Sequence, residues 1–231
     1  VLALARTARH GVVELLEPVL TDEDPEVRAN VAAALDDLEV PPDGLPLLER
    51  LLDDAHSMVR LDAALTLAGQ GDRRATPHLI RALNDSDVAP QVVRALGLLG
   101  DESAIEPLRQ LCRSWSTHPT LRASAAAALA ALDQKGGIEE LAKWLGARRR
   151  EPRAMAIHAS GELHISAARE KLCDMLGDTR ATDRDSIARS LGQIGDPRAL
   201  PALKAATNDP DPDVASEARQ AVAALEKTEA E

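Results

Sequence analysis

The sequence predicts an all-α fold, a solenoid of about seven helical hairpins. A leucine recurs at intervals of 29 to 33 residues, and the apolar residues around each one are three and four positions apart, which is the helical period. The chain of 231 residues contains no Phe or Tyr and only two Trp, so its core must be built from Leu, Val, Ile and Ala. Such side chains suit closely packed helices better than a β-sandwich.

The repeat is defined by two anchor positions. The first is a leucine six residues before a polar turn position, and a second apolar anchor follows eleven residues later in most repeats, nine in the third and thirteen in the fourth. One hairpin cannot cover its own apolar face, so equivalent neighbours must stack on it. The predicted repeats cover 11–42, 43–72, 73–101, 102–134, 135–165, 166–196 and 197–227, with 1–10 as the remnant of a preceding helix. Their anchor leucines are Leu16, Leu48, Leu79, Leu108, Leu141, Leu172 and Leu203.

Each repeat follows the same order of elements. A first helix such as ALPALKAA (199–206) leads to a polar turn and then to an Ala-rich second helix such as VRANVAAAL (27–35). Asp followed by Pro predicts a capped helix start, as at Asp24–Pro25. Gly followed by Asp predicts a left-handed residue that closes one helix and a cap for the next. This pair occurs at Gly71–Asp72, Gly100–Asp101 and Gly195–Asp196, and His164 is expected to replace the Gly in the fifth repeat.

The pattern V-R-x-x-A-A-x-A-L-G-x-L-G-D resembles HEAT repeats, specifically the short bacterial type named after phycobilisome lyases. Val27–Arg28, Val59–Arg60 and SIARSLGQIGD (186–196) carry the resemblance, which extends from Leu16 to about Leu225. It implies a right-handed α-α superhelix whose second helices line the concave face. It does not specify a function, because these repeats serve many unrelated tasks.

The resemblance also implies an Asp–Arg ladder along the spine. An Arg follows the second anchor in five repeats, and an Asp occupies the turn position in five. A planar guanidinium is well suited to bridge carboxylates of neighbouring repeats. The predicted ladder residues are Asp22, Arg28, Asp54, Arg60, Asp85, Arg122, Arg153, Asp178, Arg184 and Asp209.

Two turns depart from this pattern and are basic. One interpretation is a docking edge for an acidic peptide, a carboxylate or a phosphate. The other is a set of solvated arginines, with the Trp folded back over its longer turn. The residues are Arg113, Trp115 and His118 in the fourth repeat, Arg148, Arg149 and Arg150 in the fifth, and Arg180 in the sixth.

A second candidate surface is an outward-facing row, six residues past the second anchor of each repeat. It comprises Ala33, Leu65, Arg94, Ala127, His158, Arg189 and Gln220. Within it, Arg94, His158 and Arg189 are candidates to receive a partner. His158 and Glu162 are one helical turn apart, a spacing that can bind metal, but with no third ligand a plain surface pair is favoured and no metal or cofactor is predicted.

Two cysteines, Cys112 and Cys173, are too few for a disulfide framework or a zinc site. They lie two repeats apart, roughly 20 Å by the usual spacing of packed helices, so we expect no disulfide between them. Both are interpreted as small buried hydrophobic residues, and Trp144 as a packing residue.

The net charge of −11 argues against nucleic-acid binding, which needs a positive field. No apolar run is long enough to cross a bilayer and no signal peptide is visible, so no membrane contact is predicted and the cytoplasm is the default location. VLALARTARHG (1–11) resembles a second helix cut from a preceding repeat, so we expect further repeats or another domain before residue 1. The solenoid itself is predicted to be monomeric.

Three classes of function are compatible with such repeats: a scaffold, a phycobilin-lyase-like protein and an enzyme built on HEAT repeats. Deoxyhypusine hydroxylases, which have similar repeats, carry His-Glu dipeptides that hold iron, and this chain has none. A glycosylase would need a basic, aromatic cleft. The prediction is therefore a non-catalytic scaffold or adaptor that binds a protein or peptide, with a chromophore- or chromoprotein-handling subunit as the alternative.

Overall fold

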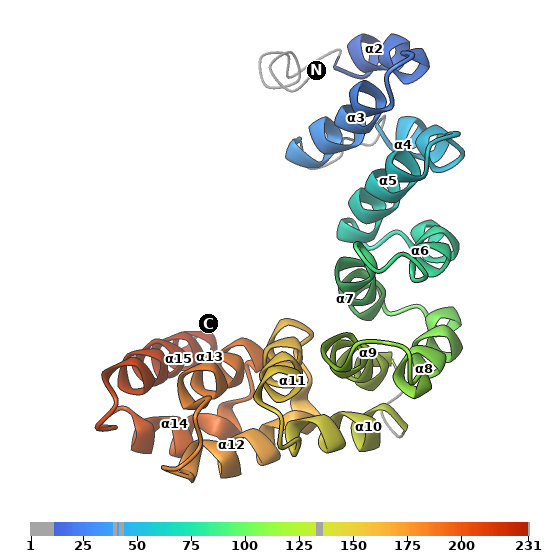
Figure 1. Cartoon of the computed structure of the whole chain (residues 1–231). Coiled ribbons are helices and arrows are strands. Elements are labelled where there is room, and N and C mark those ends of the chain that lie inside the picture. The colour runs from blue at the N-terminus through green and yellow to red at the C-terminus, as the bar shows by residue number, and fades with distance from the viewer. Residues whose placement is uncertain (1–11, 39–40, 42–43, 133–135, 231) are drawn as a thin grey trace. The chain divides into compact units, whose positions relative to one another are not determined.

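The computed structural model describes residues 12–38, 41, 44–132 and 136–230 (Figure 1). Helices and 3-10 turns are the regular elements in these ranges, and no strand occurs among them. The chain divides into two compact units, Val1–Ala104 and Ile105–Glu231. The predicted all-α fold is confirmed, whereas the continuity of one solenoid over 1–231 stays a prediction and the expected helix remnant at 1–10 lies outside the described residues.

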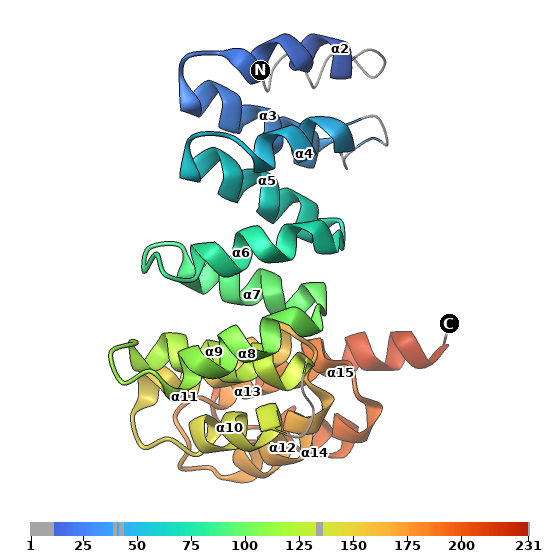
Figure 2. The same cartoon turned by 90° about the vertical axis from the view of Figure 1, so that its right-hand side faces the viewer.

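In the first unit, short first helices alternate with longer second helices. The helix α5 packs against both α3 and α7, and α4 and α6 lie beside them (Figures 1 and 2). The first helices are α2 (Val12–Leu16), α4 (Leu45–Leu52) and α6 (Thr76–Ala82), and the second helices are α3 (Pro25–Asp37), α5 (Ser57–Gly69) and α7 (Ala89–Leu99). The 3-10 turns are η1 (Glu17–Thr21), η2 (Arg73–Ala75) and η3 (Glu102–Ala104).

The second unit repeats this arrangement. Figure 1 shows α11, α13 and α15 in one layer and α10, α12 and α14 in the other, and α13 packs on both α11 and α15. The first helices are α8 (Ile105–Arg113), α10 (Gly136–Leu145), α12 (Arg169–Gly177) and α14 (Leu200–Ala206). The second helices are α9 (Pro119–Leu132), α11 (Arg150–Glu162), α13 (Arg184–Ile194) and α15 (Pro212–Ala230), and the 3-10 turns are η4 (Ser166–Ala168) and η5 (Pro197–Ala199).

The core is formed by leucine and alanine, as the composition predicts. All seven anchor leucines lie in first helices and are at most 2% exposed. The alanine-rich faces allow helices to approach closely. A Cβ built on Gly137 would lie 2.3 Å from the backbone nitrogen of Ala130, so only glycine fits where α10 meets α9.

The corners between repeats use left-handed residues. Gly71, Gly100 and Gly195 have φ values of 74°, 68° and 77°, and His164 takes φ 51° in their place, which confirms the substitution predicted for the fifth repeat. After His164, the amide of Ile165 donates to the carbonyl of Ser160 at 2.9 Å, a Schellman-type closure.

The helix starts also follow the sequence prediction. The carboxylate of Asp24 accepts from the amide of Glu26 at 2.8 Å, and Pro25 is the first residue of α3. Its missing N–H costs nothing at that position. Among the described helices, none combines the length and apolar character that a bilayer span requires.

Both cysteines are free thiols. Cys112 is buried, and Cys173 is half-buried. Burial raises the pKa of the Cys112 thiol to about 11 and also raises that of Cys173. Cys112 therefore serves as a small packing residue, as expected, whereas Cys173 is only partly covered.

Candidate partner-binding edge

Two rungs of the expected ladder are formed by a bidentate Arg–Asp pair between consecutive repeats. Arg28 donates from Nε and Nη2 to the two carboxylate oxygens of Asp54 at 2.7 and 2.8 Å. Its third nitrogen, Nη1, donates to the carbonyl of Asp22 in its own turn at 2.7 Å. These bonds hold the guanidinium rigidly, and they lower the pKa of Asp54 below its ordinary value.

The second rung lies in the other unit. Arg184 donates to both carboxylate oxygens of Asp209, with 3.0 Å between Nη1 and Oδ1, and its Nε donates to the carbonyl of Leu176 at 2.9 Å. The hydrogen bonds from Arg184 lower the pKa of Asp209. Both side chains are less than a tenth exposed, so this rung is shielded from solvent.

Two other ladder arginines meet different partners. Arg153 pairs with Asp183, with 2.9 Å between Nε and Oδ2, and not with Asp178, whose carboxylate accepts from the amide of Arg180 in its own turn. Arg122, whose repeat is followed by a turn with Ala in the acid position, donates to the carbonyl of Cys112 at 2.9 Å. Asp22 likewise accepts within its own turn, from the amide of Asp24.

Arg122 also explains the role of the second tryptophan. Its guanidinium carbon lies 5.2 Å from the ring centroid of Trp144, which is a cation–π contact. Trp144 is half-buried in α10, in agreement with its interpretation as a packing residue.

Of the predicted basic residues, Arg148 of the fifth repeat and Arg180 of the sixth come together at a cavity of about 440 Å³ between these two repeats, and those of the fourth-repeat turn do not line it. Arg148, Lys171 and Arg180 line it, and Asp178 is the acidic residue among its lining side chains. These three cations are exposed, and within the described residues their side chains form no ion pair. We call Arg148, Lys171 and Arg180 the basic edge.

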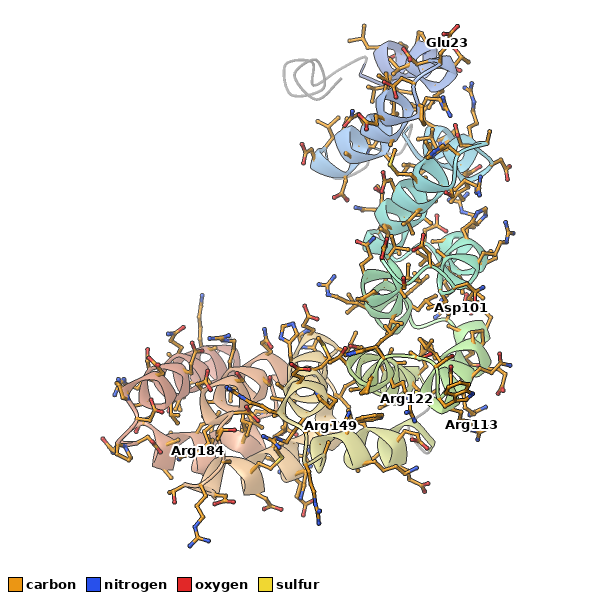
Figure 3. The ribbon with its side chains drawn as sticks, in the orientation of Figure 1. Glu23, Asp101, Arg113, Arg122, Arg149 and Arg184 are labelled. Carbon is orange, nitrogen blue, oxygen red and sulfur yellow. The ribbon has the colours of Figure 1, made fainter. Side chains whose placement is uncertain are left out.

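The other arginines of the fifth-repeat turn differ from one another. Arg150 donates to Asp183 at 2.9 Å and therefore strengthens the ladder, although its side chain is 71% exposed. Arg149 precedes α11 as its N-cap residue and is exposed (Figure 3). Arg150 thus makes a structural contact, whereas Arg149 is exposed to solvent.

The long turn of the fourth repeat presents an aromatic side chain to solvent. Trp115 is 92% exposed, so it does not fold back over its own turn. Arg113 ends α8 and is exposed (Figure 3), and the ring of His118 hydrogen-bonds the hydroxyl of Thr120 at 2.7 Å. A solvated tryptophan beside an arginine is the composition found at interface hot spots.

The second-helix face carries another cavity in the second unit. His158 and Arg189 line a cavity of about 440 Å³ together with Met155. Arg189 is engaged by Glu217, with 2.7 Å between Nη2 and Oε1, and His158 Nε2 lies 3.5 Å from Glu162 Oε2. No cluster of three potential metal ligands occurs within the described ranges.

The rest of the predicted outward-facing row is uneven. Arg94 is exposed on α7 in the first unit. Ala127 is completely buried, because α9 is covered by α8, α10 and α11 together. The row is therefore interrupted in the fourth repeat.

A family model described as HEAT repeats matches residues 1–68, 44–130, 84–152 and 138–223 of the chain. The chain belongs to the HEAT-repeat family. Its described elements, alternating helices without a strand among them, agree with the helical repeat fold of this family.

The chain is also similar to solved structures. The complex of CpcE and CpcF of phycocyanin lyase from Nostoc sp. PCC7120 matches with 20% identity and a TM-score of 0.59, over 92% of this chain and 94% of that one, and at this identity the similarity shows the fold alone. Human deoxyhypusine hydroxylase in complex with glycerol matches with 19% identity and a TM-score of 0.40, over 97% and 98%. No curated protein matches the chain at a significant level.

Sequence reasoning missed two contributors to this HEAT-repeat surface. Lys171 precedes the anchor Leu172 and belongs to no motif, yet it lines the same cavity as Arg148 and Arg180. Asp183 occupies an anchor position that is usually apolar, and this exception was the available signal that it replaces Asp178 in the ladder.

Proposed function

We propose that this HEAT-repeat protein is a non-catalytic scaffold or adaptor that binds an acidic segment of a protein partner through the basic edge. Arg148, Lys171 and Arg180 would receive the carboxylates. Trp115, from the turn of the fourth repeat, would contact an apolar side chain of the same partner. We place this activity in a monomeric protein in the cytoplasm.

The observation that carries the proposal is the set of cations without carboxylate partners. The chain has a net charge of −11, and several of its other arginines are engaged by Asp or Glu, as Arg28, Arg184 and Arg189 are. Cations left open in such a chain form a local positive surface that attracts acidic groups and repels basic ones.

The test compares two variants of equal charge. Arg148→Ala with Arg180→Ala removes two cations of the basic edge, and Arg73→Ala with Lys227→Ala removes two exposed cations elsewhere; each changes the net charge from −11 to −13. Binding of a fluorescein-labelled Asp/Glu-rich peptide is measured by anisotropy at 50 and 150 mM salt.

The edge variant should bind the peptide roughly tenfold more weakly, since two exposed charge contacts are worth ~1–2 kcal/mol together. The control should bind it like the unmodified protein, and a Gln/Asn-rich peptide should bind to none of them. Equal affinity of the edge variant and the control would refute the proposal.

The alternative is a chromophore- or chromoprotein-handling subunit, which the similarity to the CpcE–CpcF complex favours. A flat tetrapyrrole needs apolar and aromatic walls. Visible absorbance after mixing the protein with a bilin distinguishes the two functions. A shifted absorption band supports the alternative, and an unchanged band leaves the scaffold.

A further inference from the structure

The first unit contains a cavity of about 510 Å³ between the second and third repeats. The residues at its mouth come from the turn after α4, the start of α5, and α6 with the turn that follows it. Its position in the repeat is equivalent to that of the basic edge, but its lining is different. The cavity is lined by Met58, Arg60, Leu61, His78, Arg81 and Asp85, among others.

Arg60 is held in this cavity in the same way as Arg28 is held one repeat earlier. Nη1 of Arg60 donates to the carbonyl oxygens of Asp54 and Ala55 at 2.6 and 2.8 Å. Nη1 of Arg28 donates to the carbonyls at the same two offsets, six and five residues before it. Each of the two guanidinium groups is therefore hydrogen-bonded in the same way to the turn of its own repeat.

Arg28 and Arg60 differ in the partners of Nε and Nη2, which form the other edge of the guanidinium. In Arg28, Nε and Nη2 hold the carboxylate of Asp54, the turn acid of the next repeat. In Arg60, within the described part of the chain, the hydrogen bonds come from Nη1 alone, and Nε and Nη2 have no partner. The Nε–Nη2 edge of Arg60 is thus a two-donor fork that matches a carboxylate and is not used by a group of the described chain.

The turn acid of the third repeat does not fill this position. Asp85 is exposed, whereas the side chains of Asp54 and Asp209, which complete rungs, are 9% and 5% exposed. The carboxylate of Asp85 accepts from the amide of Asp87 at 3.0 Å. In this third repeat the two anchor positions, Leu79 and Val88, are nine residues apart instead of the usual eleven, so the turn that contains Asp85 is two residues shorter. The shorter turn coincides with the absence of an Arg60–Asp85 pair.

A second polar group in the cavity also has no partner. Nδ1 of His78 is buried and makes no hydrogen bond. Burial and the neighbouring Arg81 lower the pKa of His78 below 6.5, so the imidazole is neutral at pH 7 and can donate from Nδ1. A buried polar atom left unpaired costs free energy that a ligand atom would recover.

The remaining wall is apolar and would accept a short hydrocarbon body. It is formed by Leu52, Met58, Leu61, Ala82 and Val88. The volume is within the range of small-molecule sites, which span ~300–1,000 Å³. Asp53, Asp54 and Asp85 also line the cavity. The carboxylate of Asp54 is paired with Arg28, and the charges of Asp53 and Asp85 disfavour a dianion such as phosphate.

We propose that this cavity binds a monocarboxylate with a branched apolar body about the size of a leucine side chain. The ligand carboxylate occupies the Nε–Nη2 edge of Arg60, as Asp54 occupies that of Arg28, and the apolar body lies against Met58 and Leu61. The ligand thereby completes the missing rung between the second and third repeats. This site is separate from the basic edge, and either proposal can fail alone.

The test uses 4-methylpentanoate and, as the matched neutral probe, 4-methylpentanamide. Side-chain Nε–H signals of arginine are followed by NMR during titration, together with the melting temperature. The acid should shift the Arg60 signal and raise the melting temperature, and the amide should bind at least tenfold more weakly. Equal binding of acid and amide, or a shift confined to other arginines, overturns the proposal.

A second arm identifies the source of the carboxylate. An acetylated pentapeptide ending in Leu is titrated with a free and with an amidated C-terminus. Tighter binding of the free peptide than of 4-methylpentanoate indicates a partner's C-terminus, and weaker binding indicates a free acid. Either result supports the carboxylate site, whereas binding of the amidated peptide equal to that of the free peptide contradicts it.

Variants connect the binding to the fork. Arg60→Lys keeps the charge but removes the two-donor edge, so 4-methylpentanoate should bind at least tenfold more weakly, while Arg50→Lys, outside the cavity, should change nothing. Asp85→Asn should leave the affinity unchanged or raise it, since a negative charge is removed. Unaltered binding to a folded Arg60→Lys protein would refute the role of Arg60.

Discussion

In the ladder, Asp183 pairs with Arg153 at the place predicted for Asp178, and this gives a quantitative prediction for Asp183→Ala. The side chain of Asp183 is 4% exposed and accepts from both Arg150 and Arg153. It makes no capping bond to α13, so its removal affects the ladder and not the helix start. The matched control is Asp178→Ala, which removes an exposed acid from the position where the repeat pattern places the rung.

The expected loss follows from the exposure of the two arginines. Arg153 is 20% exposed, and its charged hydrogen bonds are worth ~1.5–3 kcal/mol. Arg150 is 71% exposed and adds ~0–1 kcal/mol after solvent screening. The free energy of unfolding should therefore fall by roughly 1.5–4 kcal/mol, and the melting temperature by roughly 3–15 °C for a chain of this length. Asp178→Ala should cost at most about 1 kcal/mol, the value of its turn bond.

The pH dependence gives an independent check on the same rung. Burial alone would raise the pKa of Asp183, but the hydrogen bonds from Arg150 and Arg153 outweigh it and lower the pKa below 3.8. A carboxyl whose pKa is lower in the folded state stabilises the protein above its unfolded pKa and loses this effect as the pH falls through the folded value.

The difference in the free energy of unfolding between the unmodified protein and Asp183→Ala should therefore have its full value at pH 7 and decrease below about pH 4. Thermal unfolding followed by circular dichroism at pH 7 and pH 3 measures it. A loss from Asp178→Ala equal to or larger than that from Asp183→Ala would refute this assignment of the rung.

Three further predictions concern packing and reactivity. Gly137→Ala should lower the free energy of unfolding by at least ~2 kcal/mol because its Cβ would overlap the backbone of α9, whereas Gly177→Ala, with open space around it, should change it by no more than ~0.5 kcal/mol in a denaturant titration. His164→Ala should cost ~1–2 kcal/mol because it loses the 2.6 Å ring bond to a carbonyl and keeps the left-handed strain, and His164→Gly should cost less; comparable losses would contradict this. Cys112, with its thiol pKa raised to about 11, should react with iodoacetamide at pH 8 more slowly than Cys173 in the native protein, and the two rates should converge in urea.

The fold was predictable from sequence because it depends on period and volume. The seven leucines recur at the helical-hairpin interval, and each is buried. His164 stands where the other corners carry Gly, so the register alone predicts its positive φ. Such features recur with the motif, so aligning the repeats in the sequence is enough to infer them without knowing which side chains meet in space.

The site was less predictable because side-chain partners are chosen between repeats. Arg150 and Arg149 are adjacent and chemically identical, yet one pairs with Asp183 and the other is open. Asp85 matches the pattern of a rung acid, but its shorter turn leaves it exposed. A repeat pattern gives the position of a residue, whereas the reach of its side chain depends on turn length and burial.

The central claim is that each hairpin is stable only when it packs against its neighbours. Far-UV circular dichroism of an isolated repeat, compared with the intact chain, tests this claim most directly. A peptide of residues 166–196 contains the whole sixth repeat, with η4, α12 and α13 complete. The intact chain should show a strong helical spectrum that is lost in one cooperative transition, and the peptide should be largely unfolded under the same conditions. A peptide with native helicity, or a β-type spectrum from the intact chain, would contradict the account.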